Sequence, residues 1–435
     1  MPDHPPISAE HCADFDLNDW LAYIEALHPK DIEMGLGRVN EVKQRLNLNI
    51  SFPIITVAGT NGKGSTCAML EHIYSVAGYR VGVYSSPHFL RYSERIRVAC
   101  HEISDVDLMA AFKAVEQARQ TTQLTYFEFG TLAAMWHFAQ VGLDVAILEV
   151  GLGGRLDAVN VFEPDCAVVT SVDLDHMDFL GDTRESIGAE KAGVFRPNVP
   201  AICGDNHPPA SLLEYAKKIG ADLRLIEQDF SVARATSSWN YQSSTNTIRD
   251  LPMPALKGDF QLENAACVLT AIQALQAKLP VNENAIHQGL RSVSLLGRFQ
   301  LISHRPDVIL DVAHNPHAAK SLATNLQQTS ISGKTVAVFA MLADKDIAGV
   351  IQALSKHIDV WYVAEIQHPR ACPVGDTSAL LLQYLPKADI RTFETVVGAY
   401  HQACIDVGEN DRIIALGSFF TVAEVMRAFY GNTQQ

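Results

Sequence analysis

An apolar strand that runs into a glycine-rich loop and then a helix constrains this chain more than any other feature. Residues 54–58 are Ile, Ile, Thr, Val and Ala, the loop 59–66 follows directly, and residues 67–77 are compatible with a helix. In this order the loop glycines let backbone N–H groups converge on phosphate oxygens, and the helix N-terminus adds positive potential. The segment therefore predicts a phosphate-binding loop in an α/β domain with a parallel sheet.

The loop has a cation and two hydroxyls suited to phosphate chemistry. Lys63 supplies a mobile charge for a transferred phosphoryl group, and Ser65 and Thr66 can contact phosphate or a metal. The loop departs from the common G-x-x-x-x-G-K-[ST] pattern in two places. Val57 occupies the position of the pattern's first glycine, and Gly64 separates Lys63 from Ser65. We predict a shorter variant loop; a glycine-rich turn with a solvated lysine is the alternative.

Short apolar runs and helix-period segments alternate along the chain, a pattern typical of parallel sheets covered by helices. The fold class is therefore α/β, with an N-terminal P-loop NTPase-like domain at 1–296 and a C-terminal Rossmann-like domain at 297–435. The other expected strands lie at 80–84, 144–150, 166–172, 308–312, 335–341, 360–364 and 412–416.

Two helix starts have recognisable caps. Ser104 is expected to cap a helix that runs to about residue 120, and Asp182 with Glu185 predicts a capping box for a helix through residue 192. A further helix is expected at 259–277. Residues 229–257 are polar and contain several prolines, so their structure is the least well predicted.

Composition excludes several classes of partner. The chain has 34 Lys and Arg against 49 Asp and Glu, a formal net charge of −15, which repels nucleic acid and anionic membranes. No run is long and apolar enough to span a membrane, and the first eight residues lack the pattern of a secretion signal. The eight cysteines include no Cys-x-x-Cys pair, so we expect reduced thiols and a cytoplasmic location.

Glu149 is a candidate metal ligand because it stands near the end of the apolar strand 144–150, before the glycine-rich loop 151–157. Ligands of open α/β sheets gather outside the carboxyl ends of the strands, so Glu149 is expected to face the same crevice as the phosphate loop. Magnesium is the natural partner of such a carboxylate. The alternative is a carboxylate satisfied by an arginine or by backbone donors.

Two further strand ends have possible ligands. The strand at 166–172 leads into the acidic segment 173–178, where His176 reads equally well as a metal ligand or as a hydrogen-bonded residue. Ser86 follows the strand at 80–84 in the same topological position, and an ordinary turn is its alternative.

Two other clusters are ambiguous from the residues alone. Lys191 reads from composition as an exposed helix lysine. The end of the expected strand at 308–312 carries Asp311, and His314 and Asn315 follow it just before Pro316. That cluster could hold a ribose or an amine substrate, and a helix-entry cap is an equally good interpretation.

Together these motifs resemble the folylpolyglutamate synthases of the Mur ligase superfamily, and within them the bifunctional bacterial dihydrofolate synthase/folylpolyglutamate synthases. The resemblance covers nearly the whole chain. The main departure is Ser65, where many relatives have Thr and the hydroxyl is retained. The residues that carry the resemblance stand at 56–65, 84–88, 125–128, 148–158, 175–176, 190–193, 297–299 and 311–316.

The resemblance implies a nucleotide site and a two-metal site. Ser86, Glu149 and His176 would hold magnesium, with two ions per active site. Lys191 would be carbamylated, so that its added carboxylate binds the second ion. The implied ATP-binding residues are Gly59, Asn61, Gly62, Lys63, Gly64, Ser65, Thr66, Asn264, Arg298 and Asp311.

The resemblance also implies a pterin site and a glutamate site. Phe127 would stack on the pterin, Asp157 would hydrogen-bond its polar edge, and His314 would belong to the glutamate side. Lys63, Lys191 and His314 would be the catalytic residues. The implied pterin-binding residues are Glu33, Met34, Gly35, Thr125, Tyr126, Phe127, Glu128, Leu156, Asp157 and Ala158.

The implied activity is ATP-dependent ligation of L-glutamate to dihydropteroate and to the γ-carboxylate of tetrahydrofolates, through an acyl phosphate. The expected partners are ATP, L-glutamate, dihydropteroate and reduced folates, and we expect a monomer that binds neither nucleic acid nor membrane. ATP and the pteroate are expected to draw the two domains together around Gly297.

Three alternatives compete with this activity. A folylpolyglutamate synthase without the dihydropteroate activity is disfavoured by the segments 125–128 and 156–158. A Mur-type cell-wall ligase would need a different N-terminal domain from residues 1–50. A nucleotide-binding regulatory module would need neither the second metal that Lys191 implies nor an amine site.

Overall fold

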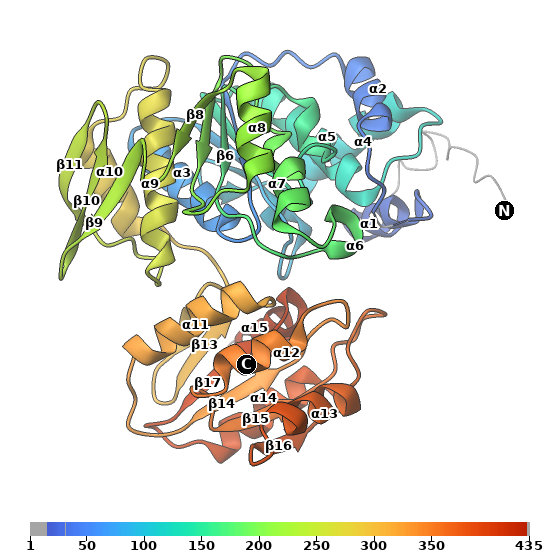
Figure 1. The fold of residues 1–435 in the computed structure, drawn as a ribbon. Coiled ribbons are helices and arrows are strands. Elements are labelled where there is room, and N and C mark those ends of the chain that lie inside the picture. The colour runs from blue at the N-terminus through green and yellow to red at the C-terminus, as the bar shows by residue number, and fades with distance from the viewer. Residues whose placement is uncertain (1–14, 31, 433–435) are drawn as a thin grey trace. The chain divides into compact units, whose positions relative to one another are not determined.

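The computed structural model describes residues 15–30 and 32–432. The chain divides into two compact units (Figure 1). The first unit holds the residues up to Leu174, Leu180–Met253 and Glu263–Val293, and the second holds Asp175–Phe179, Pro254–Leu262 and Ser294–Gln435. The first eight residues, on which the expected location partly rests, and Cys12 lie outside the described residues.

An eight-stranded sheet forms the centre of the first unit, in the order β4-β3-β2-β5-β1-β6-β7-β8. Strands β2, β5, β1, β6, β7 and β8 are parallel to their neighbours in this series. Strand β3 is antiparallel to both β2 and β4. Every residue of β1, β2, β5 and β6 is buried, which explains their nearly continuous apolar sequences. The strands are β1 (Ile54–Ala58), β2 (Val81–Tyr84), β3 (Ile96–Val98), β4 (His101–Glu102), β5 (Val145–Glu149), β6 (Cys166–Val169), β7 (Pro200–Cys203) and β8 (Asp222–Leu225).

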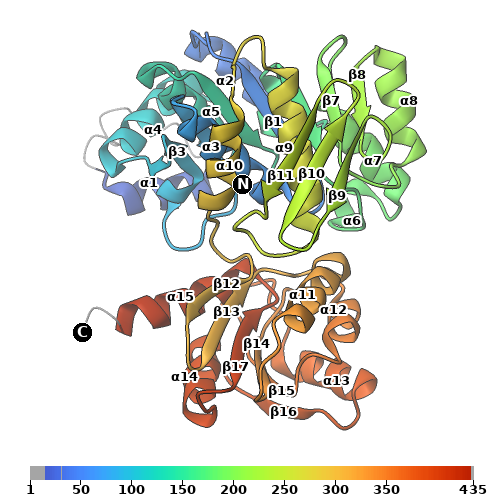
Figure 2. The same ribbon diagram turned by 90° about the vertical axis from the view of Figure 1, so that its left-hand side faces the viewer.

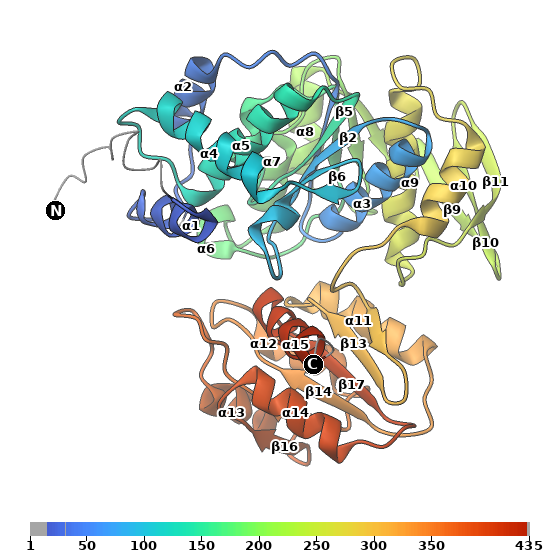
Figure 3. The ribbon, with the colours of Figure 1, turned by 180° about the vertical axis from the view of Figure 1, so that it is seen from behind.

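Helices cover both faces of this sheet. The main hydrophobic core lies between one face and the helices α1 (Leu17–Ala26), α2 (Gly37–Leu46), α4 (Asp105–Arg119), α5 (Tyr126–Val141), α7 (Arg184–Ala192) and α8 (Ala210–Ile219). On the other face α3 (Lys63–Val76) packs against β1, β2 and β5. Helix α10 (Glu283–Ser292) lies against α3 (Figure 3). A Cβ atom on Gly289 would lie 2.5 Å from Ile73 Cγ1, so only glycine allows this approach.

The polar segment 229–257 folds as a three-stranded antiparallel sheet (Figure 2). Its strands are β9 (Phe230–Arg234), β10 (Ser238–Ser243) and β11 (Thr247–Pro252). Trp239 and Tyr241 alternate with less buried residues along β10, and the Tyr241 hydroxyl lies 3.0 Å from Thr270 Oγ1 in α9 (Phe260–Ala274). The buried Tyr241 therefore attaches this sheet to α9.

A six-stranded sheet forms the second unit, in the order β12-β13-β17-β14-β15-β16, with only β12 antiparallel to its neighbour. Its core lies between one face and the helices α11 (Pro316–Gln328), α12 (Ile347–Leu354) and α13 (Val374–Tyr384). Helices α14 (Val396–Asp406) and α15 (Phe419–Asn432) pack against β14 and β17. The strands are β12 (Gln300–Ser303), β13 (Asp307–Asp311), β14 (Thr335–Phe339), β15 (Val360–Val363), β16 (Asp389–Thr392) and β17 (Arg412–Leu416). None of the helices in the described residues is both long and apolar enough to cross a membrane.

All eight predicted strands are present, with ends that differ by up to three residues. Ser104 caps α4 as predicted. The predicted capping box of α7 is wrong: Thr183, not Asp182, is the N-cap, and its side chain accepts from Ser186 N. Glu185 instead accepts hydrogen bonds at the start of α8, from Ala210 N at 3.1 Å and Ser211 N at 2.8 Å, so its carboxylate is not available to close a box.

Candidate active site

The loop between β1 and α3 has the geometry of a phosphate-binding loop. Gly62 is the N-cap of α3, and Thr66 N donates to Gly62 O at 2.9 Å. The Lys63 ammonium donates to Gly59 O at 2.9 Å and to Thr60 O at 3.2 Å, so it folds over its own loop. The backbone N–H groups of the first helical turn are the donors that an anion would use.

Two glycines of this loop cannot be replaced without strain. Gly59 has φ +144°, and a Cβ atom there would lie 1.9 Å from Thr170 Oγ1. Gly62 has φ +88°, and a Cβ atom there would lie 2.4 Å from Asn264 Oδ1. Both backbone angles are ones that L-residues rarely adopt. The buried Asn264, an expected ATP contact, therefore lies directly against the loop.

The segment after β6 holds the loop in place. Asn61 O accepts hydrogen bonds from Thr170 Oγ1 at 2.6 Å and from Ser171 Oγ at 3.1 Å, and Thr60 Oγ1 donates to Asp173 O at 3.0 Å. Sequence reasoning missed Thr170 and Ser171, because nothing in their local sequence marks contact with a loop more than a hundred positions earlier.

Within the described residues, one loop hydroxyl is buried without a hydrogen bond: Thr66 Oγ1. Ser65, its neighbour, is buried as well. Buried hydroxyls normally find a partner, so the Thr66 hydroxyl fits a group that binds at the start of α3, such as a phosphate oxygen.

Glu149 and Ser86 lie together in the first unit. Glu149 ends β5 with its side chain buried, and Ser86 N donates to Glu149 Oε2 at 3.4 Å, a long hydrogen bond. A buried carboxylate beside a serine offers hard oxygen donors of the kind that Mg²⁺ prefers, so these residues fit the predicted metal. His176, the third predicted ligand, belongs to the segment Asp175–Phe179 of the second unit.

A metal site made of protein side chains alone is not evident. Across residues 15–30 and 32–432, no three His, Cys, Asp or Glu side chains form a group that could hold a metal ion. The predicted set includes Ser86 and needs ATP oxygens or water to complete the six-fold coordination that Mg²⁺ demands.

Lys191 is buried, with 4% of its surface exposed, so its interpretation as an exposed helix lysine is wrong. It lies in the last turn of α7, where the glycine-rich loop after β5 packs over the helix. Arg155 N donates to Glu190 O at 2.8 Å, and a Cβ atom on Gly154 would lie 3.1 Å from Lys191 Cα. Helix periodicity could not predict that Lys191 is buried, because the loop that covers it comes from a distant part of the chain.

The three segments expected to bind the pterin gather in the first unit. A Cβ atom on Gly151 would lie 2.7 Å from Phe127 Cζ, so the ring lies directly over the loop that leads to Asp157. A Cβ atom on Gly153 would lie 3.7 Å from Met34 Cε. The segments 33–35, 125–128 and 151–158 therefore meet around this loop.

Arg38 joins two of these segments and was missed by sequence reasoning. Its guanidinium donates to Glu128 Oε1 at 3.0 Å, to Glu33 Oε1 at 3.2 Å and to Glu33 O at 2.9 Å. Glu128 also closes a capping box with Thr125 at the start of α5. Arg38 thus fixes the 33–35 segment beside the N-terminus of α5.

The Asp157 carboxyl is buried and accepts backbone hydrogen bonds from Leu152 N at 2.8 Å and Val159 N at 3.0 Å. Burial raises its pKa to about 7, and the backbone donors oppose this rise. Asp157 also caps the short helix η3 (Ala158–Val161). Its carboxyl therefore holds the pterin-side loop together.

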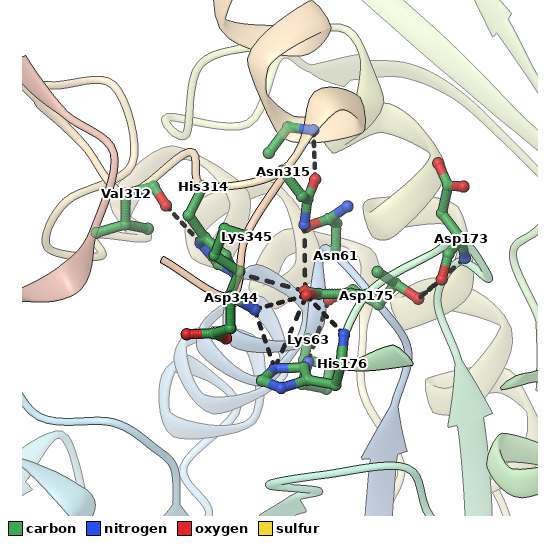
Figure 4. A network of polar contacts seen from close by, with 12 residues as sticks. Asn61, Lys63, Asp173, Asp175, His176, Val312, His314, Asn315, Asp344 and Lys345 are labelled. Carbon is green, nitrogen blue, oxygen red and sulfur yellow. Dashed lines mark hydrogen bonds and ion pairs between the residues drawn. The ribbon is translucent and has the colours of Figure 1, made fainter. Parts of the chain in front are cut away.

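In the second unit, Asp175 is the centre of a polar network (Figure 4). Lys345 Nζ lies 2.6 Å from Asp175 Oδ1, while Asn315 Nδ2 and His314 Nε2 lie 3.3 and 3.6 Å from Oδ2. Burial alone would raise the pKa of Asp175. The hydrogen bond from His314 and the charges of His314, His176 and Lys345 outweigh it and hold the pKa well below its usual range. Lys345 was not predicted as a site residue.

The residues that end β13 have structural roles as well. Asn315 accepts from Ala318 N at 2.9 Å and caps α11, which confirms the helix-entry interpretation for this residue. Asp311 accepts from Phe299 N and Ala313 N, both at 2.8 Å. Burial raises the pKa of Asp311, and Arg298 opposes that rise. His314 Nδ1 lies 2.8 Å from Val312 O, and Nε2 is the ring nitrogen that faces Asp175.

Known proteins match nearly the whole chain, and two family models match most of it. The Mur ligase middle domain matches residues 57–272, and the Mur ligase glutamate ligase domain matches residues 297–419. The chain is 47% identical over 413 residues to a dihydrofolate synthase/folylpolyglutamate synthase of Escherichia coli, covering 94% of each protein. The chain belongs to the dihydrofolate synthase/folylpolyglutamate synthase family of Mur ligases.

Solved structures of the family share this fold. Escherichia coli FolC in complex with DHPP and ADP has a TM-score of 0.91 and 44% identity, covering 97% of this chain and 99% of that one. A bifunctional folylpolyglutamate synthase/dihydrofolate synthase with Mn, AMPPNP and L-glutamate bound has a TM-score of 0.88 and 46% identity, covering 96% and 98%. The predicted family and α/β fold class are confirmed, and the chain is an ATP-dependent ligase.

Proposed function

We propose that this ligase joins L-glutamate to dihydropteroate, giving dihydrofolate, and to the γ-carboxylate of reduced folates, with ATP and through an acyl phosphate. One observation carries the proposal: Phe127, Met34 and the loop to Asp157 gather in the unit that also holds the phosphate loop. The names of the most similar relatives, which combine both activities, support it.

The chemistry requires an activated carboxylate. An oxygen of the acceptor carboxylate attacks the γ-phosphorus of ATP, the bond from that phosphorus to the β–γ bridging oxygen breaks, and ADP leaves. The α-amine of glutamate, as the free base, then attacks the acyl carbon, and phosphate leaves as the amide forms. In this proposal Lys63 neutralises charge on the transferred phosphoryl group, with the loop N–H groups and with Gly59, Asn61, Gly62, Gly64, Ser65, Thr66 and Asn264 around the nucleotide.

The metal sites are part of the proposal. Ser86, Glu149 and His176 would hold one magnesium ion, and a carbamylated Lys191 would hold a second. When bound, the ions supply positive charge against the charge that develops on the phosphoryl oxygens. The position of Glu149 at the end of β5, next to the backbone of Ser86, supports the assignment of the first ion.

The glutamate side is assigned to the C-terminal domain, 297–435, and the ATP and pterin sides to the N-terminal domain, 1–296. His314 would help to orient the glutamate amine, and Arg298 and Asp311 would contact the nucleotide. We propose that the enzyme acts in the cytoplasm as a monomer, without nucleic acid or membrane partners.

Phosphate release from ATP, with magnesium and glutamate present, tests the proposal. The acceptors to compare are dihydropteroate, tetrahydrofolate and none. Release with both acceptors, dependent on glutamate, is the expected result. Release with tetrahydrofolate alone would reduce the enzyme to a folylpolyglutamate synthase, and no release with either acceptor would contradict the folate assignment.

A further inference from the structure

Arg95 is an immobilised cation in the first unit. It ends the short helix η2 (Tyr92–Arg95), and its guanidinium lies over two aromatic rings, 5.2 Å from the centre of Tyr92 and 5.5 Å from that of Tyr126. Its Nε donates to His88 Nδ1 at 2.8 Å. Two cation–π contacts and one hydrogen bond therefore fix the plane of the guanidinium.

Within the described residues, no carboxylate pairs with this guanidinium. The acid next to it in sequence, Glu94, is already used, because its two oxygens accept from Phe89 N, Leu90 N and Arg91 N, each at 2.7 Å. In a chain with 49 acidic residues against 34 basic ones, a partly buried arginine that is fixed in place but not paired with an acid points to an anionic ligand.

The position of Arg95 suggests which anion it binds. Arg95 O accepts from Ser85 N at 2.9 Å, next to Ser86, which is proposed to hold metal on the phosphoryl-transfer side. On its other side, Tyr126 precedes Phe127, proposed to stack on the pterin. The guanidinium itself contacts His88 and Tyr126, so it lies between the loop that carries Ser86 and the helix end that carries Phe127. With the pterin and phosphate sites as proposed, an acceptor that joins them would pass this point.

The two proposed acceptors differ in their carboxylates. Dihydropteroate ends in one carboxylate, which must be free to attack ATP. A folate ends in glutamate and has two, so an enzyme that extends it at the γ-position must hold the α-carboxylate away from the phosphoryl group. The planar fork of an arginine binds a carboxylate through two parallel hydrogen bonds.

We propose that Arg95 binds the α-carboxylate of the terminal glutamate of a folate acceptor and so directs ligation to the γ-carboxylate. This inference rests on the proposed function. It makes Arg95 a specificity residue for the folate reaction, with no role in the dihydropteroate reaction.

The test compares kcat/KM of Arg95→Gln and wild type with dihydropteroate and with tetrahydrofolate. Loss of a charge-assisted bidentate contact lowers kcat/KM for tetrahydrofolate by at least about 10-fold, mainly through KM. The value for dihydropteroate stays within about 2-fold, which also shows that the variant folds. Arg91→Gln is the matched control, because Arg91 lies on the same turn, is exposed and pairs with Glu102 at 2.8 Å.

A third acceptor makes the test specific for the α-carboxylate. In this analogue 4-aminobutyrate replaces the terminal glutamate, so the γ-carboxylate remains and the α-carboxylate is missing. Wild type and Arg95→Gln have equal kcat/KM for the analogue if Arg95 acts as proposed. An equal loss with all three acceptors, or no loss with tetrahydrofolate, overturns the inference. A wild type that is inactive with every acceptor instead contradicts the proposed function.

Discussion

Burial sets the chemistry of single residues in this site. Asp157 shows it most directly, because its carboxyl is shielded from water while backbone N–H groups surround it. The net effect raises its pKa to about 7. The same loop covers Lys191, which the sequence alone presents as an ordinary surface lysine.

The raised pKa of Asp157 predicts a pH dependence of stability. The folded pKa lies above the unfolded value of about 3.9, so the folded state binds the proton more tightly. The contribution of the Asp157 carboxyl to the free energy of unfolding is fully present below the unfolded pKa. This contribution is lost as pH rises toward 7, by at most about 1.4 kcal/mol per pH unit. We expect the melting temperature of the wild type to fall more steeply than that of Asp157→Asn between about pH 5 and 7. Parallel curves would mean that the folded pKa is not raised.

Lys191 is expected to be essential for catalysis and dispensable for folding. Lys191→Met keeps most of the apolar stem and removes the amine that would be carbamylated. We expect kcat for phosphate release to fall by at least about 100-fold, comparable to the loss of a group that stabilises transition-state charge. Lys218→Met, at an exposed lysine of α8, is the control. An active Lys191→Met enzyme would exclude a role for the carbamylated lysine.

At the scale of elements, one buried ion pair joins the phosphate-loop helix α3 to strand β3. Arg97 in β3 contacts the buried Glu71 in α3, with Nη2 2.7 Å from Oε2 and Nε 3.1 Å from both oxygens. Arg97 Nη1 also donates to Ser85 Oγ at 3.2 Å, one residue before the proposed metal ligand Ser86. The pair thus holds the start of the Ser85–His88 loop against α3.

Replacing only Arg97 of this pair should lower the free energy of unfolding more than replacing both Arg97 and Glu71. Arg97→Met leaves the Glu71 carboxylate buried without its cation, which we expect to lower the free energy of unfolding by about 3–5 kcal/mol. Arg97→Met combined with Glu71→Leu should recover most of that loss, because no buried charge is left. Urea unfolding of the two variants measures the difference. A double variant as unstable as the single one would contradict this account.

The sequence predicted elements better than it predicted contacts between them. Buried parallel strands such as β1 and β17 are nearly continuous apolar runs, so they could be located. The β9–β11 sheet could not, because its few buried residues are scattered singly among polar ones and form no continuous apolar run. Arg38 was missed for another reason. Its contact with Glu128 joins residues 90 positions apart, and the sequence around either residue gives no sign of the other.

At the scale of the whole molecule, both units carry residues expected to contact ATP, Lys63 in the first and Arg298 in the second. We therefore expect ligands to draw the units together around Gly297 and to exclude water that would hydrolyse the acyl phosphate. Small-angle X-ray scattering should show a smaller radius of gyration with a non-hydrolysable ATP analogue and dihydropteroate than without ligands. An unchanged radius would contradict closure.

The contact between Gly289 and Ile73 has a consequence for how the protein is made. Helix α3 leaves the ribosome early, but α10, which covers it, is synthesised only after the strands of both sheets of the first unit. Until then the outer side of α3 lacks its partner, so the nascent chain carries an incomplete nucleotide-binding unit for most of translation. Chains truncated before Glu283 should therefore aggregate or need chaperones, because their exposed apolar surface favours association.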